Sequence, residues 1–389
     1  MREGWLQTTL GDVCDLTKGT TPTMKARPGP YPLVVTAEDR ASSDEFQFDT
    51  EAVCIPTVSS TGHGHASLKR VHYESGKFAV ANILVACTAK AGAPVLMRYL
   101  WLLLDHSRDQ LIVPLMKGTA NVALSQRALA AVSLILPPLR EQRRIVDLIG
   151  ALDSTSRLLA SHAEAASEEL ASLRRYLLAG TQQWSEVRLG EVARPTTGRA
   201  FPTRFQGART GTYPYIKCSD MNGVGQERVI TEAANWIDDP TQAQLKAKIL
   251  PAGTVIFPIL GAALATEKRR VLGRPAAFDQ NVMGLEPGPA ITSDFLLAVM
   301  SEISLSRHAQ RGAVPSVNQA IVAAIPFRLP PVDEQRRIDG LLVAAGDAAA
   351  HSVAAATSLR SARVELLATL LSGEHAIPEA YDELMGEAS

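Results

Sequence analysis

The sequence has none of the short motifs that mark the common enzyme active sites. It contains no Gly-x-x-x-x-Gly-Lys-Ser/Thr, no His-Glu-x-x-His and no Gly-x-Ser-x-Gly, which excludes a P-loop ATPase, a zinc-protease helix and a nucleophile elbow. No asparagine is followed by proline, so the Asn-Pro-Pro-aromatic motif of amino-group DNA methyltransferases is absent as well. We therefore expect this chain to catalyse no reaction.

Cysteines and long apolar runs are also scarce. The 4 cysteines lie far apart without a Cys-x-x-Cys pair, so neither a zinc site nor a disulfide framework is indicated. His63-Gly64-His65 has no cluster of carboxylates or cysteines near it, and we expect no metal there. No run of about 18 apolar residues occurs, nor does an apolar signal segment follow Met1. We expect a cytoplasmic protein.

The charge is distributed unevenly although the formal net charge is only −1. Residues 1–140 hold 14 Lys/Arg against 12 Asp/Glu, and residues 184–330 hold 16 against 12. Five acids and no Lys or Arg follow Gly373. An acidic tail thus offsets two mildly basic parts, which permits nucleic-acid binding without indicating it.

Several segments of the chain occur twice. Residues 136–145 read LPPLREQRRI, and residues 329–338, 193 positions later, read LPPVDEQRRI. Residues 5–13 (WLQTTLGDV) match residues 184–192 (WSEVRLGEV) at an offset of 179, and later YPLV at 31–34 matches YPYI at 213–216. Duplication of this kind indicates two versions of one structural unit.

The repeats divide the chain into two globular domains and two long helices. The predicted parts are domain 1 at 1–140, a helix at 141–180, domain 2 at 184–333, a helix at 334–373 and an acidic tail at 374–389. Within the domains, β-like runs such as 78–85 and 254–257 alternate with Gly/Pro-rich turns, and a helical stretch covers 295–307. The predicted fold class is therefore mixed α/β.

Both helices carry a coiled-coil pattern. Apolar or small residues fall alternately four and three apart for five heptads, which is the 3.5-residue period of a seam between helices. The seam positions are Ile145, Ile149, Leu152, Ser156, Leu159, Ala163, Ala166, Leu170, Leu173 and Leu177 in the first helix, and Ile338, Leu342, Ala345, Ala349, Ser352, Ala356, Leu359, Arg363, Leu366 and Leu370 in the second. Arg363 breaks the pattern, and we expect it to face a partner carboxylate or to extend into solvent. Antiparallel pairing would set the small residues at the two helix centres against each other.

Each helix is also bounded by residues that stop helices. Pro137-Pro138 and Pro330-Pro331 precede them, and Gly180 and Gly373 follow them. A helix of about 38 residues, the expected length of each, would be about 57 Å long at about 1.5 Å per residue.

Polar, glycine-flanked loops are the candidates for contact with nucleic acid. Hydroxyls and backbone amides suit phosphate oxygens, cations and imidazoles suit guanine, and amide side chains can read adenine. The candidates in domain 1 are Lys18, Thr20, Ser59, Ser60, Thr61, His63, His65, Lys69 and Arg70. Those in domain 2 are Arg199, Lys217, Lys268, Arg269, Arg270, Gln280 and Asn281. Any one loop is equally explained as a solvated turn, but Lys18-Gly19-Thr20 and Thr197-Gly198-Arg199 occupy equivalent early loops in both domains.

The paired LPPxxEQRRI motifs and the paired Trp-x-x-x-x-Leu-Gly-(Asp/Glu)-Val openings resemble those of the specificity (S) subunits of Type I restriction–modification systems. Gly261-Ala262-Ala263 and Phe278-Asp279-Gln280-Asn281-Val282 in domain 2 strengthen the resemblance, which covers essentially the whole chain. It implies that each domain is a target recognition domain that reads one half of a bipartite DNA site. It also implies that two antiparallel helices hold the domains apart as a ruler. Because the domains align only in fragments, we expect an asymmetric target.

The resemblance further implies that the helices dock two modification (M) subunits, possibly joined by restriction (R) subunits. The helix-start residues expected to serve this docking are Glu141, Gln142, Arg143, Arg144, Glu334, Gln335, Arg336 and Arg337. The M subunits would hold S-adenosylmethionine, and an R subunit would use ATP and Mg. This chain itself would bind no cofactor and no metal.

Two other interpretations remain open at this point. The globular halves of a helical adaptor would bind protein instead of DNA, which a gel shift on random duplexes would reveal. An enzyme with unrecognised motifs would transfer methyl groups by itself, without an M subunit.

Overall fold

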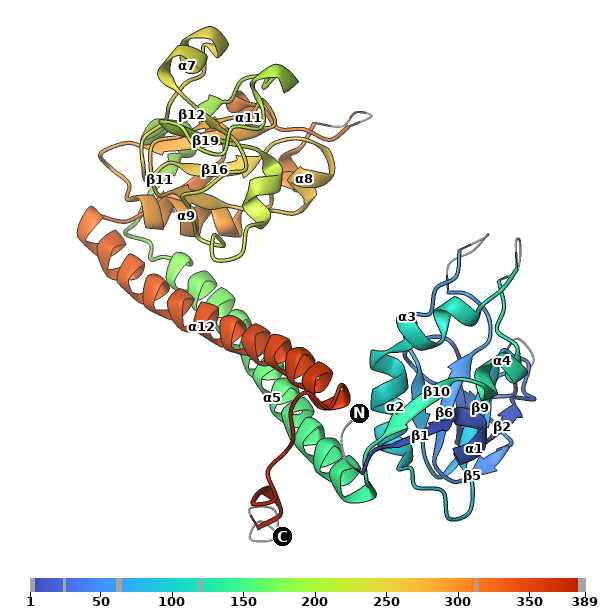
Figure 1. Ribbon diagram of the computed structural model, residues 1–389. Coiled ribbons are helices and arrows are strands. Elements are labelled where there is room, and N and C mark those ends of the chain that lie inside the picture. The colour runs from blue at the N-terminus through green and yellow to red at the C-terminus, as the bar shows by residue number, and fades with distance from the viewer. Residues whose placement is uncertain are drawn as a thin grey trace. The chain divides into compact units, whose positions relative to one another are not determined.

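The computed structural model describes residues 4–23, 26–60, 65–118, 122–310, 312 and 314–383. It separates into two compact units, one formed by Met1–Leu159 with Ala355–Ser389 and the other by Ala160–Ala354. Each unit contains one α/β domain and part of both long helices (Figure 1). This division cuts the helices, so the domain limits drawn from the sequence stay a prediction. No helix in the described part of the chain has an apolar stretch long enough to cross a membrane.

Domain 1 contains two small sheets and a two-stranded ribbon. The first sheet has the antiparallel order β2 (Cys14–Lys18), β9 (Leu84–Ala89), β6 (Ala52–Pro56), β7 (His72–Glu74). The second has the order β4 (Ala41–Ser43), β3 (Tyr31–Val34), β8 (Lys77–Val80), β5 (Phe48–Asp49), with β3 and β8 parallel. The ribbon pairs β1 (Leu6–Thr9) with β10 (Ser133–Leu136). The helices are α1 (Leu10–Val13), α2 (Met97–His106), α3 (Arg108–Leu111) and α4 (Gln126–Ala130), with a 3-10 turn at Val113–Leu115.

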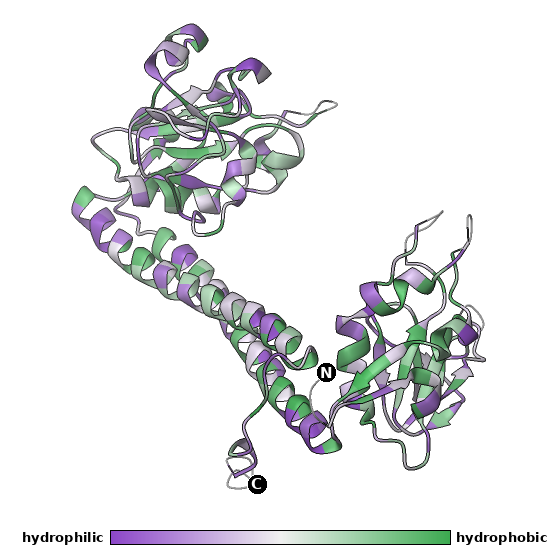
Figure 2. Cartoon of the chain, viewed as in Figure 1, coloured by the Kyte–Doolittle hydropathy of each residue, from purple (hydrophilic) through white to green (hydrophobic). Residues whose placement is uncertain are grey.

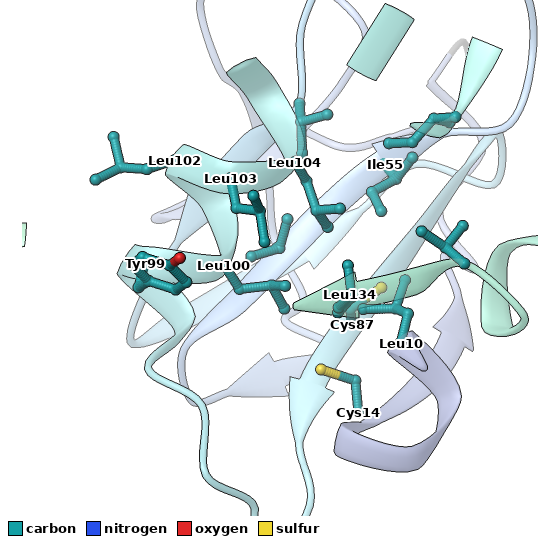
Figure 3. Close-up of a cluster of buried hydrophobic side chains, with 14 of the residues drawn as sticks. Leu10, Cys14, Ile55, Cys87, Tyr99, Leu100, Leu102, Leu103, Leu104 and Leu134 are labelled. Atoms are coloured by element: carbon teal, nitrogen blue, oxygen red, sulfur yellow. The ribbon is translucent and has the colours of Figure 1, made fainter. Parts of the chain in front are cut away.

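The core of domain 1 lies between α2 and the first sheet. Leu100 and Leu104 of α2 point toward the strands that carry Ile55 and Cys87 (Figure 3). The cysteines of this domain are all buried, and burial raises the pKa of Cys14 and of Cys54 to about 12. They therefore pack as small apolar groups and are poor nucleophiles or metal ligands.

Domain 2 also has two sheets and a ribbon, but its first sheet has five strands instead of four and its second has three instead of four. Its first sheet has the order β12 (Ala193–Thr197), β19 (Val282–Pro287), β16 (Val255–Pro258), β17 (Arg270–Leu272), β14 (Val229–Ile230), and its second β15 (Trp236–Ile237), β13 (Tyr213–Ile216), β18 (Ala277–Phe278). The ribbon pairs β11 (Ser185–Arg188) with β20 (Pro326–Leu329). The helices are α6 (Leu189–Val192), α7 (Asp239–Leu245), α8 (Gly261–Ala265), α9 (Ser293–Glu302), α10 (Leu305–His308) and α11 (Gln319–Ala323), with 3-10 turns at Thr203–Phe205 and Cys218–Asn222.

The two YP segments begin equivalent strands in the two domains. In domain 1 β3 runs parallel to β8 with Val34 opposite Val80, and in domain 2 β13 runs parallel to β18 with Ile216 opposite Phe278. Antiparallel pairs are the majority in both domains, so a parallel pair at the same place in each is a specific feature. Its presence in both domains confirms that the repeated sequence builds a repeated structure.

Two elements differ from the sequence prediction. The run 78–85 forms two strands, because the chain turns after Val80 with a hydrogen bond from Leu84 N to Ala81 O of 2.9 Å. The stretch 295–307 forms α9 and α10, which separate at Ile303 and Ser304. The Glu267 carboxylate accepts the backbone N–H groups of Leu305 and Ser306, so it caps the start of a second helix there.

The long helices are α5 (Leu139–Leu178) and α12 (Val332–Leu371). Each begins directly after its Pro-Pro pair, and Gly180 and Gly373 follow with φ of 68° and 73°, the left-handed conformation of a glycine cap. Every predicted seam position is buried or half-buried. Figure 2 shows hydrophobic and hydrophilic residues interspersed along both helices, as expected for helices that are apolar on one side.

Within each unit the two helix segments run antiparallel. In the first unit, Arg363 bonds Asp153 at 2.7 Å, and Ile145 and Ile149 share a core cluster with Leu370. In the second unit, Leu170 packs against the space beside Gly346. Position 170 follows 153 by 17 residues, and 346 precedes 363 by 17, so both contacts belong to one antiparallel register. Arg363 thus faces a carboxylate of its own chain.

Candidate nucleic-acid interface

In domain 1 a glycine lets the loop after β2 cross the end of the parallel pair β3–β8, and in domain 2 a glycine lets the loop after β12 cross the end of β13–β18. A Cβ on Gly19 would overlap the carbonyl oxygens of Val80 and Ala81, and a Cβ on Gly198 would overlap those of Phe278 and Asp279. The two backbone N–H groups bond equivalent carbonyls, Gly19 N to Leu84 O at 2.9 Å and Gly198 N to Val282 O at 3.1 Å. Only glycine allows so close a crossing, and the residues next to it are brought to the strand ends.

Four of the predicted residues of domain 2 gather at this crossing. Arg199 N bonds Phe278 O at 3.0 Å, and the Arg199 backbone forms a parallel bridge with Asp279, directly before Gln280 and Asn281. Arg199 is exposed. Asn281 N bonds Asp279 Oδ1 at 2.8 Å. Lys217, directly after β13, donates to Gln206 Oε1 at 2.6 Å. The cluster therefore offers a cation, an exposed amide and a second cation at one edge of the domain.

Two stacked aromatic rings, Phe201 and Tyr215, pack against residues of this cluster. The Phe201 ring stacks on Tyr215 with centroids 3.9 Å apart, and the Lys217 ammonium lies 5.4 Å from the Phe201 centroid. The Tyr215 hydroxyl donates to Arg199 O at 2.9 Å. Burial raises the pKa of Tyr215 to about 12, so its hydroxyl keeps its proton at neutral pH. The ring and its hydroxyl hold the crossing loop in place.

The equivalent crossing of domain 1 carries different side chains. Lys18 and Thr20 flank Gly19 and are exposed. Gln47 fastens them, since its Oε1 accepts from Thr20 N at 3.1 Å and its Nε2 donates to Lys18 O at 3.0 Å. Asn82 stands two residues after β8, where Gln280 stands after β18, and is also exposed. Sequence reasoning missed Gln47 and Asn82. The YP segments repeat at an offset of 182, whereas Asn82 and Gln280 are 198 residues apart, so only the strand pairing of β3 with β8 and of β13 with β18 aligns these two residues.

The predicted 59–70 loop lies only partly within the described residues. Thr61 and His63 fall outside them. Ser59 Oγ bonds His65 O at 2.5 Å, and Ser60 Oγ accepts from Lys69 N at 3.1 Å. These hydroxyls shape the loop itself. Lys69 is exposed, whereas Arg70 pairs with Glu38 at 2.9 Å.

The predicted basic run 268–270 needs a correction. Arg269 is only 5% exposed and donates to Glu267 Oε2 and to the carbonyls of Met300 and Ile303. Arg270 donates to the carbonyls of Arg269 and Met221. Both guanidinium groups are thus used to hold loops of domain 2, and a DNA contact would break those bonds. Lys268, which bonds Asn222 Oδ1 while half-buried, is the remaining candidate of the three.

The helix starts contain a second correction. Gln142 is fully buried; it accepts from Leu96 N at 2.8 Å and donates to Pro94 O and Pro137 O at 2.9 and 2.8 Å. Gln335 repeats all three bonds with Thr292 N, Ala290 O and Pro330 O, each at 2.9 Å. The glutamine of each LPPxxEQRRI motif therefore joins helix to domain and is not available to a partner.

The remaining helix-start residues differ in their exposure. Arg144 is 8% exposed and bonded to Asp382. Arg143, Arg336 and Arg337 are exposed, and Glu141 and Glu334 are half-buried. The exposed arginines stay candidates for partner binding.

No group of three or more His, Cys, Asp or Glu that could hold a metal ion is found in the described ranges. What the two domains share is the glycine crossing with its polar side chains and the buried glutamine at the helix start.

A family model described as the Type I restriction modification DNA specificity domain matches residues 2–166 and, a second time, residues 181–342. The chain belongs to this family. Because it carries two copies of a DNA specificity domain, it is a DNA target-recognition subunit.

Two solved structures share its fold over nearly the whole chain. One is the S subunit of a Type I restriction–modification system from M. genitalium, 16% identical, with a TM-score of 0.62 over 94% of this chain and 96% of that chain. The other is described as the structural basis underlying complex assembly and conformational transition of the type I R-M system. It is 20% identical, with a TM-score of 0.57 over 95% of this chain and 98% of that chain. Both support the arrangement of two α/β domains with two long helices.

Proposed function

We propose that this chain is the non-catalytic specificity subunit of a Type I complex in which each domain reads one half of a bipartite, asymmetric DNA site. The observation that carries the proposal is the glycine crossing, which presents different side chains at equivalent positions. Domain 1 offers Lys18, Thr20 and Asn82, and domain 2 offers Thr197, Arg199 and Gln280. Arginine reads guanine and an amide reads adenine in the major groove, so two unlike sets predict two unlike half-sites.

The long helices support a role as a spacer between the half-sites. Each has 40 residues, which corresponds to about 60 Å at about 1.5 Å per residue. The seam positions are buried or half-buried within both units, and a paired helix is stiffer than a single one. Recognition elements on one face of B-DNA are about 34 Å apart per helical turn, a distance that helices of this length can span.

The chemistry would belong to partner proteins. Two modification subunits would dock on the helices and hold S-adenosylmethionine, and a restriction subunit, where present, would use ATP and Mg. The solved structure described in terms of type I R-M complex assembly supports partners of this kind. Such a complex works on DNA, which fits the expected cytoplasmic location.

The test uses one alanine variant in each domain, in the complex with the host's modification subunit. Arg199→Ala should relax the base preference in one half-site and weaken binding about tenfold, which is within the ~1–3 kcal/mol of a bidentate base contact. Asn82→Ala should affect only the other half-site. Methylome sequencing identifies the half-sites, and a gel shift series measures affinity.

Arg194→Ala is the matched control, because Arg194 is a 72% exposed arginine of domain 2 that pairs with Glu286. It should leave both half-sites unchanged. If Arg199→Ala and Asn82→Ala also leave the methylated motif unchanged, the crossing loops do not read DNA. If deletion of the gene leaves the methylome intact, the proposed function itself is wrong.

A further inference from the structure

The segment 374–383 after the second helix folds back onto the start of α5 in its own unit. Asp382 accepts two bonds from Arg144, with Oδ1 2.7 Å from Nε and Oδ2 2.7 Å from Nη2. Arg140 Nε donates to the same carboxylate at 2.8 Å. Ile377 is 7% exposed and belongs to the core cluster of this unit, against which Tyr381 packs. Carboxylate and apolar contacts thus lie side by side on one short segment.

Side chains hold most of this segment, because its backbone joins no strand and bonds α12 where that helix ends, with His375 N 3.2 Å from Thr369 O. The backbone N–H groups of Tyr381 and Asp382 bond Pro378 O and Glu379 O, inside the segment. Of the two arginines, Arg140 keeps 63% of its side chain exposed. The exposed Arg140 pair contributes little to stability, so the pair of Asp382 with the buried Arg144 is the main polar contact that must break when the segment leaves. A segment held in this way can leave without disrupting a sheet or a helix.

Among the described residues of the other unit, no segment covers the corresponding helix start in this way, and the Arg337 side chain there is 61% exposed. Arg337 occupies the position of Arg144 and pairs with Glu334 of its own helix at 2.7 Å. Asp333 stands where the first helix has Arg140. Glu141 stands three residues before Arg144, as Glu334 does before Arg337. A partner within the helix was therefore available to Arg144, yet Arg144 bonds a carboxylate from the far end of the chain.

We propose that segment 374–383 is a removable cover, and that the Arg140–Arg144 surface beneath it docks a protein segment with a carboxylate beside apolar side chains. The tail has the same combination of groups, the carboxylate of Asp382 beside the apolar side chains of Ile377 and Tyr381. The proposal rests on the proposed function, in which two modification subunits dock at the helix starts. Within the described residues only the start of α5 is covered. The two subunits should therefore bind in unequal steps, and the weaker step should require the tail to leave.

The test compares the full chain with three variants. Asp382→Asn removes the charge from the contact, and a truncation after Gly373 removes the tail. Glu383→Gln is the control, because Glu383 is exposed and adjacent to Asp382. Hydrogen–deuterium exchange of the tail peptide shows whether the cover opens. Calorimetric titration with the purified modification subunit of the same host measures the two binding steps.

For the full chain and Glu383→Gln we expect two steps of unequal affinity. Asp382→Asn should raise tail exchange and strengthen the weaker step about tenfold, and the truncation should make the steps nearly equal. Unchanged exchange in Asp382→Asn, or risen exchange with an unchanged weaker step, would overturn the proposal. So would a gain in salt-dependent duplex DNA binding in place of a gain in protein binding. If even the full chain binds no modification subunit, it is the proposed function that fails.

Discussion

At the scale of single residues, neighbouring polar side chains have opposite roles. In the motif shared by both helix starts, the glutamine lies in the interior with three hydrogen bonds, while the arginine after it is exposed. A buried amide with all its bonds made stabilises the structure, and leaving its partners unpaired costs about 1–3 kcal/mol. The polar residues of the repeated motif are thus partly structural.

Gln142→Leu should lower the free energy of unfolding by about 2 kcal/mol, because Leu96 N and two carbonyls lose their bonding partner in the interior. Gln335→Leu should have the same effect through its equivalent bonds. Urea unfolding followed by circular dichroism measures the change. Arg143→Gln, at an exposed neighbouring position, is the control and should shift nothing. Equal midpoints for all the variants would contradict the proposed joining role.

Glu267 should make domain 2 sensitive to acid. Burial alone would raise its pKa, but hydrogen bonds from Ser306 and the bond from Arg269 outweigh this and lower the pKa to about 2 from 4.5. A carboxylate with a lower pKa in the folded state contributes stability above its unfolded pKa and loses it as pH falls toward the folded pKa. We therefore expect Glu267→Gln to be less stable than the parent at pH 7.

That difference should narrow between about pH 4.5 and pH 2, where the parent takes up the extra proton on unfolding. Urea midpoints at several pH values measure it. Glu232→Gln, at an exposed position of the same domain, is the control. A gap of constant size across this range would show that Glu267 acts through packing alone.

At the scale of elements, the helix seam uses two different solutions at corresponding positions. The Asp153–Arg363 pair in the first unit corresponds, at an offset of 193, to Gly346 and Leu170 in the second. One site is a partly buried ion pair and the other is a leucine packed over a glycine. The seam therefore accepts either kind of contact at this position.

We expect that replacing both residues of the ion pair costs little stability, whereas replacing either one alone lowers it. Asp153→Ala or Arg363→Leu alone leaves a half-buried charge without its partner and should cost roughly 0.5–1 kcal/mol. The double variant should regain most of this loss, because apolar residues often substitute well for a partly buried pair. A double-mutant cycle by urea unfolding gives the coupling energy, with Arg360→Ala as an exposed control. Strictly additive losses would mean that the two side chains do not interact.

At the scale of the whole molecule, one chain holds two related but unlike domains and two helices of equal length. The domains share their parallel strand pair and their glycine crossing. They differ in the crossing side chains, and α7 follows β15 only in the second. Two domains of similar fold that carry different contact residues would read two different half-sites, as an asymmetric bipartite target requires.

Deleting 160–166 and 350–356 removes one heptad from each helix and keeps the Asp153–Arg363 and Leu170–Gly346 contacts in register. The helices shorten by about 10 Å at about 1.5 Å per residue. With DNA rising about 3.4 Å per base pair, the unspecified gap should shrink by roughly three base pairs. Methylome sequencing should show unchanged half-sites. An unchanged gap would exclude the helices as the ruler.

The sequence alone determined the repeat, the helix limits and the seam, because each depends on local spacing. Pro-Pro pairs and capping glycines bound a helix wherever it packs, and a 3.5-residue period marks the buried side before any partner is known. Only the tertiary structure decided which polar residues are free. Gln142, Arg144 and Arg269 are of residue types that are usually exposed, so the sequence does not mark them as buried. Each is buried through a contact with a residue distant in sequence: Leu96, Asp382 and Met300, respectively. Burial of a polar side chain depends on what folds over it, and that is a property of the assembled domain.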